Sequence, residues 1–173
     1  MNNQLFSNKG FSLIEVMVTL VLLTIGMLGL VAMQGRSIQY TQDSAQRNNA
    51  AMLATELMEM IRANPDDSSE YLLTELPAKD DNISCDGSAT TENSDVEKQL
   101  KCWANNVHLL LPDAATLKSE FHACRSKTPG TCAAGSAIEI QLAWRAVGEG
   151  CLDANAAANA DTSICRLSIR GEL

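Results

Sequence analysis

Aromatic residues and positive charges are both scarce in this chain of 173 residues. Phe, Trp and Tyr make up 4% of the sequence, too little to line a large aromatic pocket for a small molecule. Lys and Arg number 13 against 21 Asp and Glu, which gives a formal net charge of −8, and the cations do not cluster. Because binding to phosphate backbones depends on clustered cations, the composition argues against a nucleic-acid-binding protein.

Sequence patterns of catalytic sites are lacking as well. The chain has no Gly-x-Ser-x-Gly nucleophile motif, no glycine loop for phosphate and no carboxylate pair in a recognisable cleft pattern. His108 lies between Val107 and Leu109 in a helical pattern, where a partly exposed polar side chain is ordinary. We therefore expect no enzymatic activity and no cofactor.

Charge is almost absent between Phe11 and Met33, where Glu15 is the one charged side chain. As a helix, residues 11–33 would rise ~34 Å, enough to cross a hydrocarbon core of ~30 Å. The run is longer than the apolar region of a secretory signal, and no small-residue cleavage site follows it. We therefore expect a retained membrane anchor, with Lys9 weakly placing the N-terminus in the cytoplasm.

Glu15 is unusual in such a segment. A carboxylate at mid-depth in a membrane helix costs roughly 2.5–3.5 kcal/mol, and less near the interface. Either Glu15 stays close enough to the headgroups to remain hydrated, or it awaits a cationic partner within an assembly. A chain amine created by cleavage before Phe11 would be such a partner.

The run from Lys9 to Val16, KGFSLIEV, resembles the processing site of type IV prepilins. The resemblance implies that residues 1–10 are a leader, which a prepilin peptidase removes by cleavage between Gly10 and Phe11. It also implies N-methylation of the new amine of Phe11. Glu15 would then pair with the amine of a neighbouring subunit during filament assembly.

Two further stretches are similar to the PilV minor pilins, which are type IV pilus modification proteins. They are IGMLGLVAMQ at residues 25–34 and the helical run that ends at residues 60–65. The resemblance implies a minor pilin that helps prime pilus assembly, enters the pilus near its tip, and supports surface piliation and twitching motility. Its implied partners are membrane lipid before assembly, other minor and major pilins through the N-terminal helix, and a large tip adhesin. Its implied location is the inner membrane, as a single-pass protein with a periplasmic head, and then the extracellular pilus.

Residues 34–64 continue the helix with an amphipathic pattern. One helix from Phe11 to Ala63 would be ~80 Å long, ended by a left-handed cap at Asn64 and by Pro65. Gly26 to Gly29 is where we expect the helix to loosen in a filament, unless these glycines serve close helix packing. The expected core stripe is Ile38, Ala45, Met52, Leu57, Met60 and Ile61. The expected polar side is Gln39, Asp43, Gln46, Arg47, Thr55, Glu59 and Arg62.

Residues 65–173 are expected to form the head. Residues 66–95 are polar and predict a long loop with one helical turn; a calcium site at residues 80–82 is disfavoured because the spacing and glycine of a calcium loop are missing. A capping-box pattern of Ser94 and Glu97 precedes a helical segment that Pro112 ends. Alternating apolar residues predict strands at Ala137–Arg145 and Cys165–Arg170. The fold class is α+β: a pilin-like long N-terminal helix, with a transmembrane first half, packed on a small antiparallel sheet in a disulfide-stapled head.

All six cysteines lie in the expected head, and six cysteines allow 15 connectivities. Nearest-neighbour pairing would give Cys85–Cys102, Cys124–Cys132 and Cys151–Cys165, although the sequence alone does not select among the connectivities. Metal binding near His122 and Cys124 is the competing interpretation. No Cys-x-x-Cys pair is present and the spacings fit no zinc ribbon, so structural disulfides are favoured.

Two other functions share these features. A minor pseudopilin of a type II secretion system has the same N-terminal motif, although such heads are generally smaller and poor in cysteine. A tip module that binds a protein or glycan, as an adhesin does, is the other candidate. The phenotype of a deletion strain distinguishes a pseudopilin from a pilus subunit, and a binding assay tests for a tip module that binds a ligand.

Overall fold

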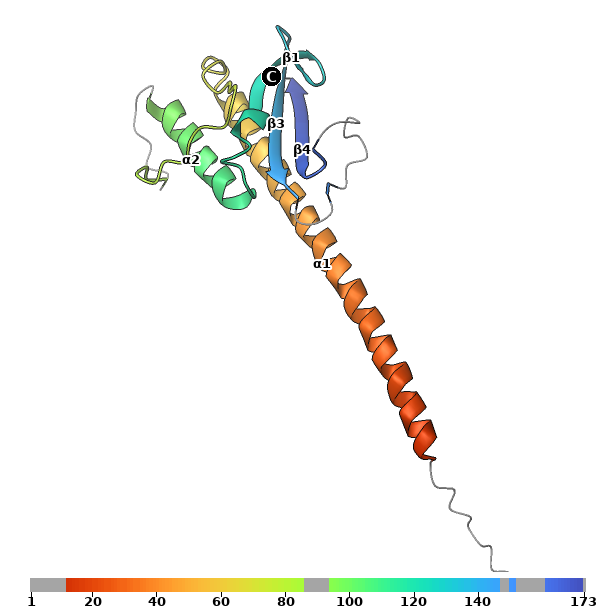
Figure 1. Ribbon diagram of the computed structural model, residues 1–173. Coiled ribbons are helices and arrows are strands. Elements are labelled where there is room, and N and C mark those ends of the chain that lie inside the picture. Colours follow the sequence, from red (N-terminus) through yellow and green to blue (C-terminus); the bar gives the residue numbers. More distant parts are fainter. Residues whose placement is uncertain (1–11, 86–93, 147–149, 152–160, 173) are drawn as a thin grey trace, which may run out of the picture. The chain divides into compact units, whose positions relative to one another are not determined.

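The computed structural model describes residues 12–85, 94–146, 150–151 and 161–172. By internal contacts the chain divides into two units, residues 1–40 and 41–173, and the first helix contributes to both. The elements in chain order are α1 (Leu13–Ala63), α2 (Ser94–Leu110), the short 3₁₀ helix η1 (Lys118–Glu120), β1 (His122–Thr128), β2 (Thr131–Cys132), β3 (Ala137–Arg145) and β4 (Ile164–Glu172) (Figure 1).

The long N-terminal helix is present as expected within the described residues, and it ends at Ala63. The mode of termination differs from the expected left-handed cap, because Asn64 is not among the residues with positive φ. Instead, the Asn64 side-chain amide donates to the Met60 carbonyl over 2.9 Å and satisfies one of the last carbonyls of the helix. Pro65, which has no N–H to donate, then prevents continuation.

The face of α1 that packs into the head is only partly the expected stripe. Leu57 and Ile61 are buried as expected and Met60 is half-buried, but Ile38, Ala45 and Met52 are exposed. The buried residues of α1 are Asp43, Ala50, Leu53, Ala54, Leu57, Met58 and Ile61.

The correction has a geometric reason. The exposed residues of the expected stripe follow one another at seven-residue steps, and so do Asp43, Ala50 and Leu57. The second line is displaced from the first by five residues, which is about 140° around a helix. Asp43 was expected on the polar side, yet it begins the buried line.

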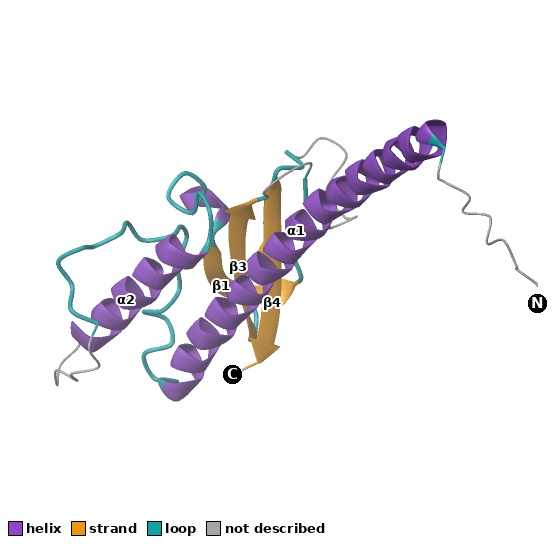
Figure 2. Ribbon diagram, turned by 90° about the horizontal axis from the view of Figure 1, so that it is seen from below, coloured by secondary structure: helices purple, strands orange, loops and turns teal. Residues whose placement is uncertain are grey.

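The four strands form one antiparallel sheet in the order β2-β1-β3-β4. Both predicted strands are confirmed as β3 and β4, and β4 extends by one residue before and two residues after the expected range. The part of α1 that follows residue 41 lies along one face of the sheet (Figure 2). Toward it point four fully buried side chains of β3, namely Ile138, Ile140, Leu142 and Trp144.

The other face of β3 is also buried at Glu139 and Ala143, unlike the half-exposed strand that the alternation suggested. β3 is a central strand, and the β1–β2 hairpin contacts the Glu139 side chain on this second face. The sequence did not predict β1 or β2. The run HACRSKT is mostly polar and lacks the branched apolar residues that mark β3.

The second predicted helix is confirmed as α2, and a tryptophan attaches it to α1. Trp103 is buried, and its indole N–H donates to the Leu53 carbonyl over 2.9 Å. The apolar face of α2 that surrounds it contributes Val96, Leu100, Ala104 and Val107 to the core.

The segment at residues 66–85 contains turns at 66–71 and then runs without regular structure, in keeping with the expected loop. Leu73 pairs with Ala123 of β1 through two backbone hydrogen bonds of 2.8 Å. Asn105 of α2 exchanges hydrogen bonds with the backbone of Asp80, at 2.9 and 2.7 Å. Side chains of α2 and one strand residue therefore hold this loop in place.

Candidate functional site

The first turn of α1 contains Glu15, the charged residue of the apolar segment. The Ser12 carbonyl accepts hydrogen bonds from the backbone N–H groups of Glu15 and Val16, at 3.0 and 3.3 Å, so the helix starts directly after Ser12. The pattern Ser12-x-x-Glu15 is a capping-box sequence, which the sequence reasoning did not identify. A carboxylate in this position is favoured by about 0.3–1 kcal/mol through the unpaired N–H groups of the helix start. Gly10 and Phe11, the expected cleavage and methylation residues, lie outside the described residues.

The helix surface that follows Glu15 is apolar and exposed. By length and composition α1 could cross a membrane, and its most apolar window has no buried residue. The hydroxyls of Thr19 and Thr24 each donate over 2.8 Å to the carbonyl three residues earlier, which satisfies these polar groups inside the helix. The exposed apolar side chains are Leu13, Ile14, Val16, Met17, Val18, Leu20, Val21, Leu22, Leu23, Ile25, Met27, Leu28, Leu30, Val31 and Met33.

α1 is helical through Gly26 and Gly29, the region expected to loosen in a filament. A Cβ added at Gly26, Gly29 or Gly35 would meet no atom of the described residues within 4 Å. Packing within this chain therefore does not require glycine at these positions.

Three disulfides staple the head: Cys85–Cys102, Cys124–Cys132 and Cys151–Cys165. These are the pairs that nearest-neighbour pairing gives, and no cysteine remains as a thiol. The first joins the loop at residues 66–85 to α2, the second closes the β1–β2 hairpin, and the third joins Cys151 to β4. Each one therefore ties an irregular segment or a hairpin to a regular element.

His122 lies close to the second of these disulfides. One ring nitrogen of His122 and the sulfurs of Cys124 and Cys132 lie within 4.8 Å of one another. This is the place where metal binding competed with a disulfide in the sequence interpretation. In the structure the two sulfurs are bonded to each other, so neither is a thiolate ligand in this oxidised state.

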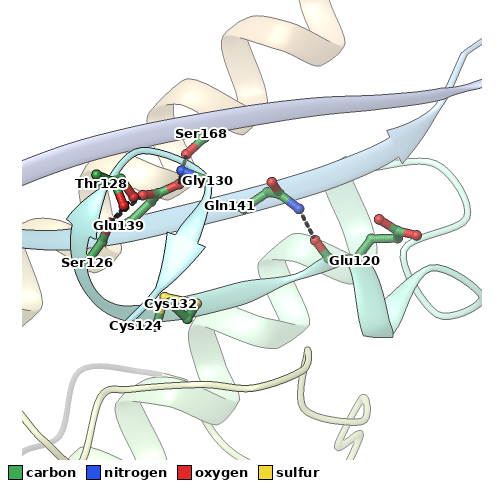
Figure 3. The surroundings of a disulfide bond; sticks show 9 residues. All are labelled: Glu120, Cys124, Ser126, Thr128, Gly130, Cys132, Glu139, Gln141 and Ser168. Carbon is green, nitrogen blue, oxygen red and sulfur yellow. Dashed lines mark hydrogen bonds between the residues drawn. A yellow bond between two sulfur atoms is a disulfide. The ribbon is translucent and has the colours of Figure 1, made fainter. Parts of the chain in front are cut away.

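A buried carboxylate organises the β1–β2 hairpin (Figure 3). Glu139 on β3 is 1% exposed. Its Oε1 accepts from the backbone N–H of Gly130 at 2.7 Å and from the Ser168 hydroxyl at 3.1 Å. Its Oε2 lies 2.8 Å from the Ser126 hydroxyl, which is also 2.8 Å from the Thr128 carbonyl.

The pKa of Glu139 lies below its ordinary value. Burial acts to raise this pKa, but the hydrogen bonds from Ser126, Gly130 and Ser168, together with the nearby His122, outweigh it. The sequence reasoning missed this cluster. The one available signal was a charged residue within a strongly apolar strand.

A second buried carboxylate, Asp43 of α1, has no comparable set of donors. Asp43 is 7% exposed, and its Oδ2 has no hydrogen-bond partner in the described parts of the chain. Its Oδ1 lies 3.9 Å from the Cys165 sulfur, which carries no proton to donate because Cys165 is in a disulfide. The Oε1 of Gln46, one helical turn further on, is buried without a partner as well.

Two known protein families match adjoining parts of this chain. The prokaryotic N-terminal methylation motif matches residues 5–31, and the family described as type IV pilin Tt1218 matches residues 32–107. No curated protein and no solved structure matches the chain significantly. Residues 5–31 are thus similar to a prepilin-type methylation motif, and residues 32–107, which reach to Val107 of α2, are similar to a type IV pilin family.

Proposed function

We propose that this chain, with its prepilin-type N-terminus and type IV pilin domain, is a minor pilin of the PilV type. It helps prime assembly of the type IV pilus and enters the pilus near its tip, and it thereby supports surface piliation and twitching motility. The single observation that carries the proposal is the methylation motif at residues 5–31, which runs directly into the pilin domain at residues 32–107.

The described geometry supports an assembly role for the helix. Glu15 is exposed in the first turn of α1, and the apolar side chains that follow have no partner among the described residues. In a membrane the acyl chains of the lipids cover this apolar surface, and in a filament the helices of other pilins would cover it. Extraction from the membrane then exchanges one apolar environment for another, so the charge at Glu15 is left to set the register between subunits.

Processing is proposed to create the partner of Glu15. A prepilin peptidase removes residues 1–10 on the cytoplasmic side and methylates the amine of Phe11. This amine pairs with Glu15 of a neighbouring pilin. The head, residues 65–173, lies in the periplasm before assembly and outside the cell afterwards, where disulfides are stable.

The intact mass of the protein, purified from the membranes of its own host, tests the processing. We expect the mass of residues 11–173 plus one methyl group. Reduction should add the mass of six hydrogens, because the six cysteines form three disulfides. A full-length, unmethylated mass would refute the proposal.

Assembly is tested by Glu15→Gln, expressed in a strain that lacks the wild-type gene. We expect normal insertion and accumulation in the membrane, few pili, and little variant protein in the sheared pilus fraction. Glu59→Gln is the matched control, since it removes an exposed carboxylate of the same helix, which pairs with Arg62 at 2.8 Å. Wild-type piliation by Glu15→Gln would rule out the charge pairing.

The alternative role, as a minor pseudopilin of a type II secretion system, makes a different prediction for a deletion strain. Loss of secreted enzymes with normal pili would favour it, whereas loss of pili and of twitching with normal secretion favours the pilus. The match to a type IV pilin family supports the proposal that a deletion strain loses pili and twitching and keeps normal secretion. A large tip adhesin is the proposed external partner, and its copurification with the minor pilins tests that contact.

A further inference from the structure

His122, Cys124 and Cys132 have the composition and the placement of a metal-ligand set. Side chains alternate along a strand, so His122 and Cys124 point to the same face of β1. The hairpin brings Cys132 of β2 to that face, because Ser126 of β1 pairs with Cys132. The ring nitrogen and the two sulfurs consequently lie within 4.8 Å of one another.

These ligand types and distances suit zinc. Zn²⁺ binds thiolate sulfur at about 2.3 Å and imidazole nitrogen at about 2.0–2.1 Å in a tetrahedral arrangement. Tetrahedral angles at these bond lengths place neighbouring ligand atoms roughly 3.5–3.8 Å apart. The cluster therefore needs only small movements of a short hairpin, once the sulfurs are no longer bonded to each other.

The surroundings favour a metal in two ways. The Nε2 atom of His122 is buried and has no hydrogen-bond partner among the described residues, so this ring is not fully committed to a protein contact. Cys132 is exposed, which gives a metal ion and a reductant access and leaves a water molecule to complete the coordination. Two thiolates also neutralise the charge of Zn²⁺, so the closed site would add no net charge beside Glu139.

We propose that reduction of the Cys124–Cys132 disulfide creates a zinc site formed by Cys124, Cys132 and His122. A dithiol reductant supplies two electrons and two protons. The sulfur–sulfur bond is cleaved to two thiols, and the reductant becomes a disulfide. Zn²⁺ then displaces the two thiol protons and binds the two thiolates and the imidazole, which links the two strands in place of the covalent bond.

Neither of the other two disulfides belongs to such a ligand group in the part of the chain that the structure describes, although Cys85 is exposed as Cys132 is. Cys165 is 2% exposed and lies against the Asp43 carboxylate, which disfavours approach of a thiolate. The cluster at His122 is the one group of this kind among the described residues. The second histidine, His108, has its Nε2 2.9 Å from the Pro77 carbonyl and belongs to no such group.

The test uses the full-length protein in detergent, reduced with a phosphine because dithiols themselves bind zinc. The phosphine becomes a phosphine oxide with oxygen from water, whose protons pass to the sulfurs. Zinc uptake is measured by competition with a chromophoric chelator. We expect about one zinc per chain after reduction and none before. Fluorescence of Trp103 and Trp144, both buried in the head, reports whether the core stays folded.

The variants decide which residues hold the metal. We expect His122→Gln to weaken zinc binding at least tenfold and His108→Gln, the matched control, to leave it unchanged. The double variant Cys124→Ser/Cys132→Ser should lose the site. The proposal is overturned if the reduced wild type takes up no zinc, or if uptake survives unchanged in His122→Gln or in the double serine variant.

Discussion

The hydrogen bonds around Glu139 predict that two substitutions of this residue differ sharply in cost. In Glu139→Gln the amide oxygen can replace Oε1 and accept from Gly130 and Ser168. The amide NH₂ can replace Oε2 and donate to the Ser126 hydroxyl, whose own proton then goes to the Thr128 carbonyl 2.8 Å away. Every hydrogen bond is kept, and only the strength that the charge adds is lost.

Removing the side chain has a different result. In Glu139→Ala the backbone N–H of Gly130 loses its acceptor, whereas Ser126 retains Thr128 and exposed Ser168 can turn to water. Hydrogen bonds to a charged group contribute about 1.5–3 kcal/mol each. We therefore expect the free energy of unfolding at pH 7 to fall by about 3 kcal/mol in Glu139→Ala and by about 1 kcal/mol in Glu139→Gln.

The pH dependence follows from the lowered pKa of Glu139. The carboxyl has its ordinary pKa, 4.5, in the unfolded chain and a lower pKa in the folded head, so it stabilises the fold fully above that ordinary value. This contribution is lost as the pH falls through the folded-state pKa. The stability difference between wild type and Glu139→Gln should therefore be constant near neutral pH and shrink below about pH 5.

Urea unfolding of the disulfide-intact protein in detergent measures these differences, because both tryptophans lie in the head core and report on it directly. Equal destabilisation by Gln and Ala would refute the exchange of hydrogen bonds through Ser126. Parallel pH profiles of wild type and Glu139→Gln would refute the lowered pKa.

Two further predictions concern the packing of the head. Trp103→Phe removes the indole donor to the Leu53 carbonyl, whereas the buried Nε1 of Trp144 has no partner among the described residues. Thermal unfolding should therefore show that Trp103→Phe costs about 1–3 kcal/mol more stability than Trp144→Phe. Equal costs would contradict a role for that hydrogen bond. Gly135→Ala would place a Cβ in collision with the Ser126 carbonyl oxygen, so we expect a loss of about 1–3 kcal/mol in urea unfolding and no comparable loss for Gly26→Ala. A neutral Gly135→Ala would show that the backbone at Gly135 moves freely away from β1.

Elements with a strong period were predictable from the sequence. The apolar run without proline gave α1, and the spacing of Val96, Leu100, Trp103 and Val107 gave α2. The alternation of β3 and β4 gave two strands and the α+β class. In α2, β3 and β4 an apolar face leaves its period in the sequence, whereas α1 is marked by a continuous apolar run.

Features that depend on contacts between distant segments were not predictable. β1 is held by its pairing with β3 and Leu73 and by a disulfide, so its own side chains need not be apolar. The burial of Asp43 and Glu139 depends on what covers them, whereas their polarity alone indicated that both side chains are exposed. Along α1, Met52 and Leu57 are both apolar, and the position of the sheet decides which of them is buried.

The residues on either side of residues 152–160 are joined by contacts that do not involve residues 152–160 themselves. The Cys151–Cys165 disulfide joins the two sides, and backbone hydrogen bonds of 3.0 and 2.8 Å connect Cys151 to Thr162 and Ala146 to Ser163. With the ends fixed this way, doubling the length between them adds only about 0.6 kcal/mol of closure entropy. An epitope or a fluorophore-labelling sequence inserted there should leave the sheet intact, which makes it the place to mark this subunit and find its position in an assembled filament.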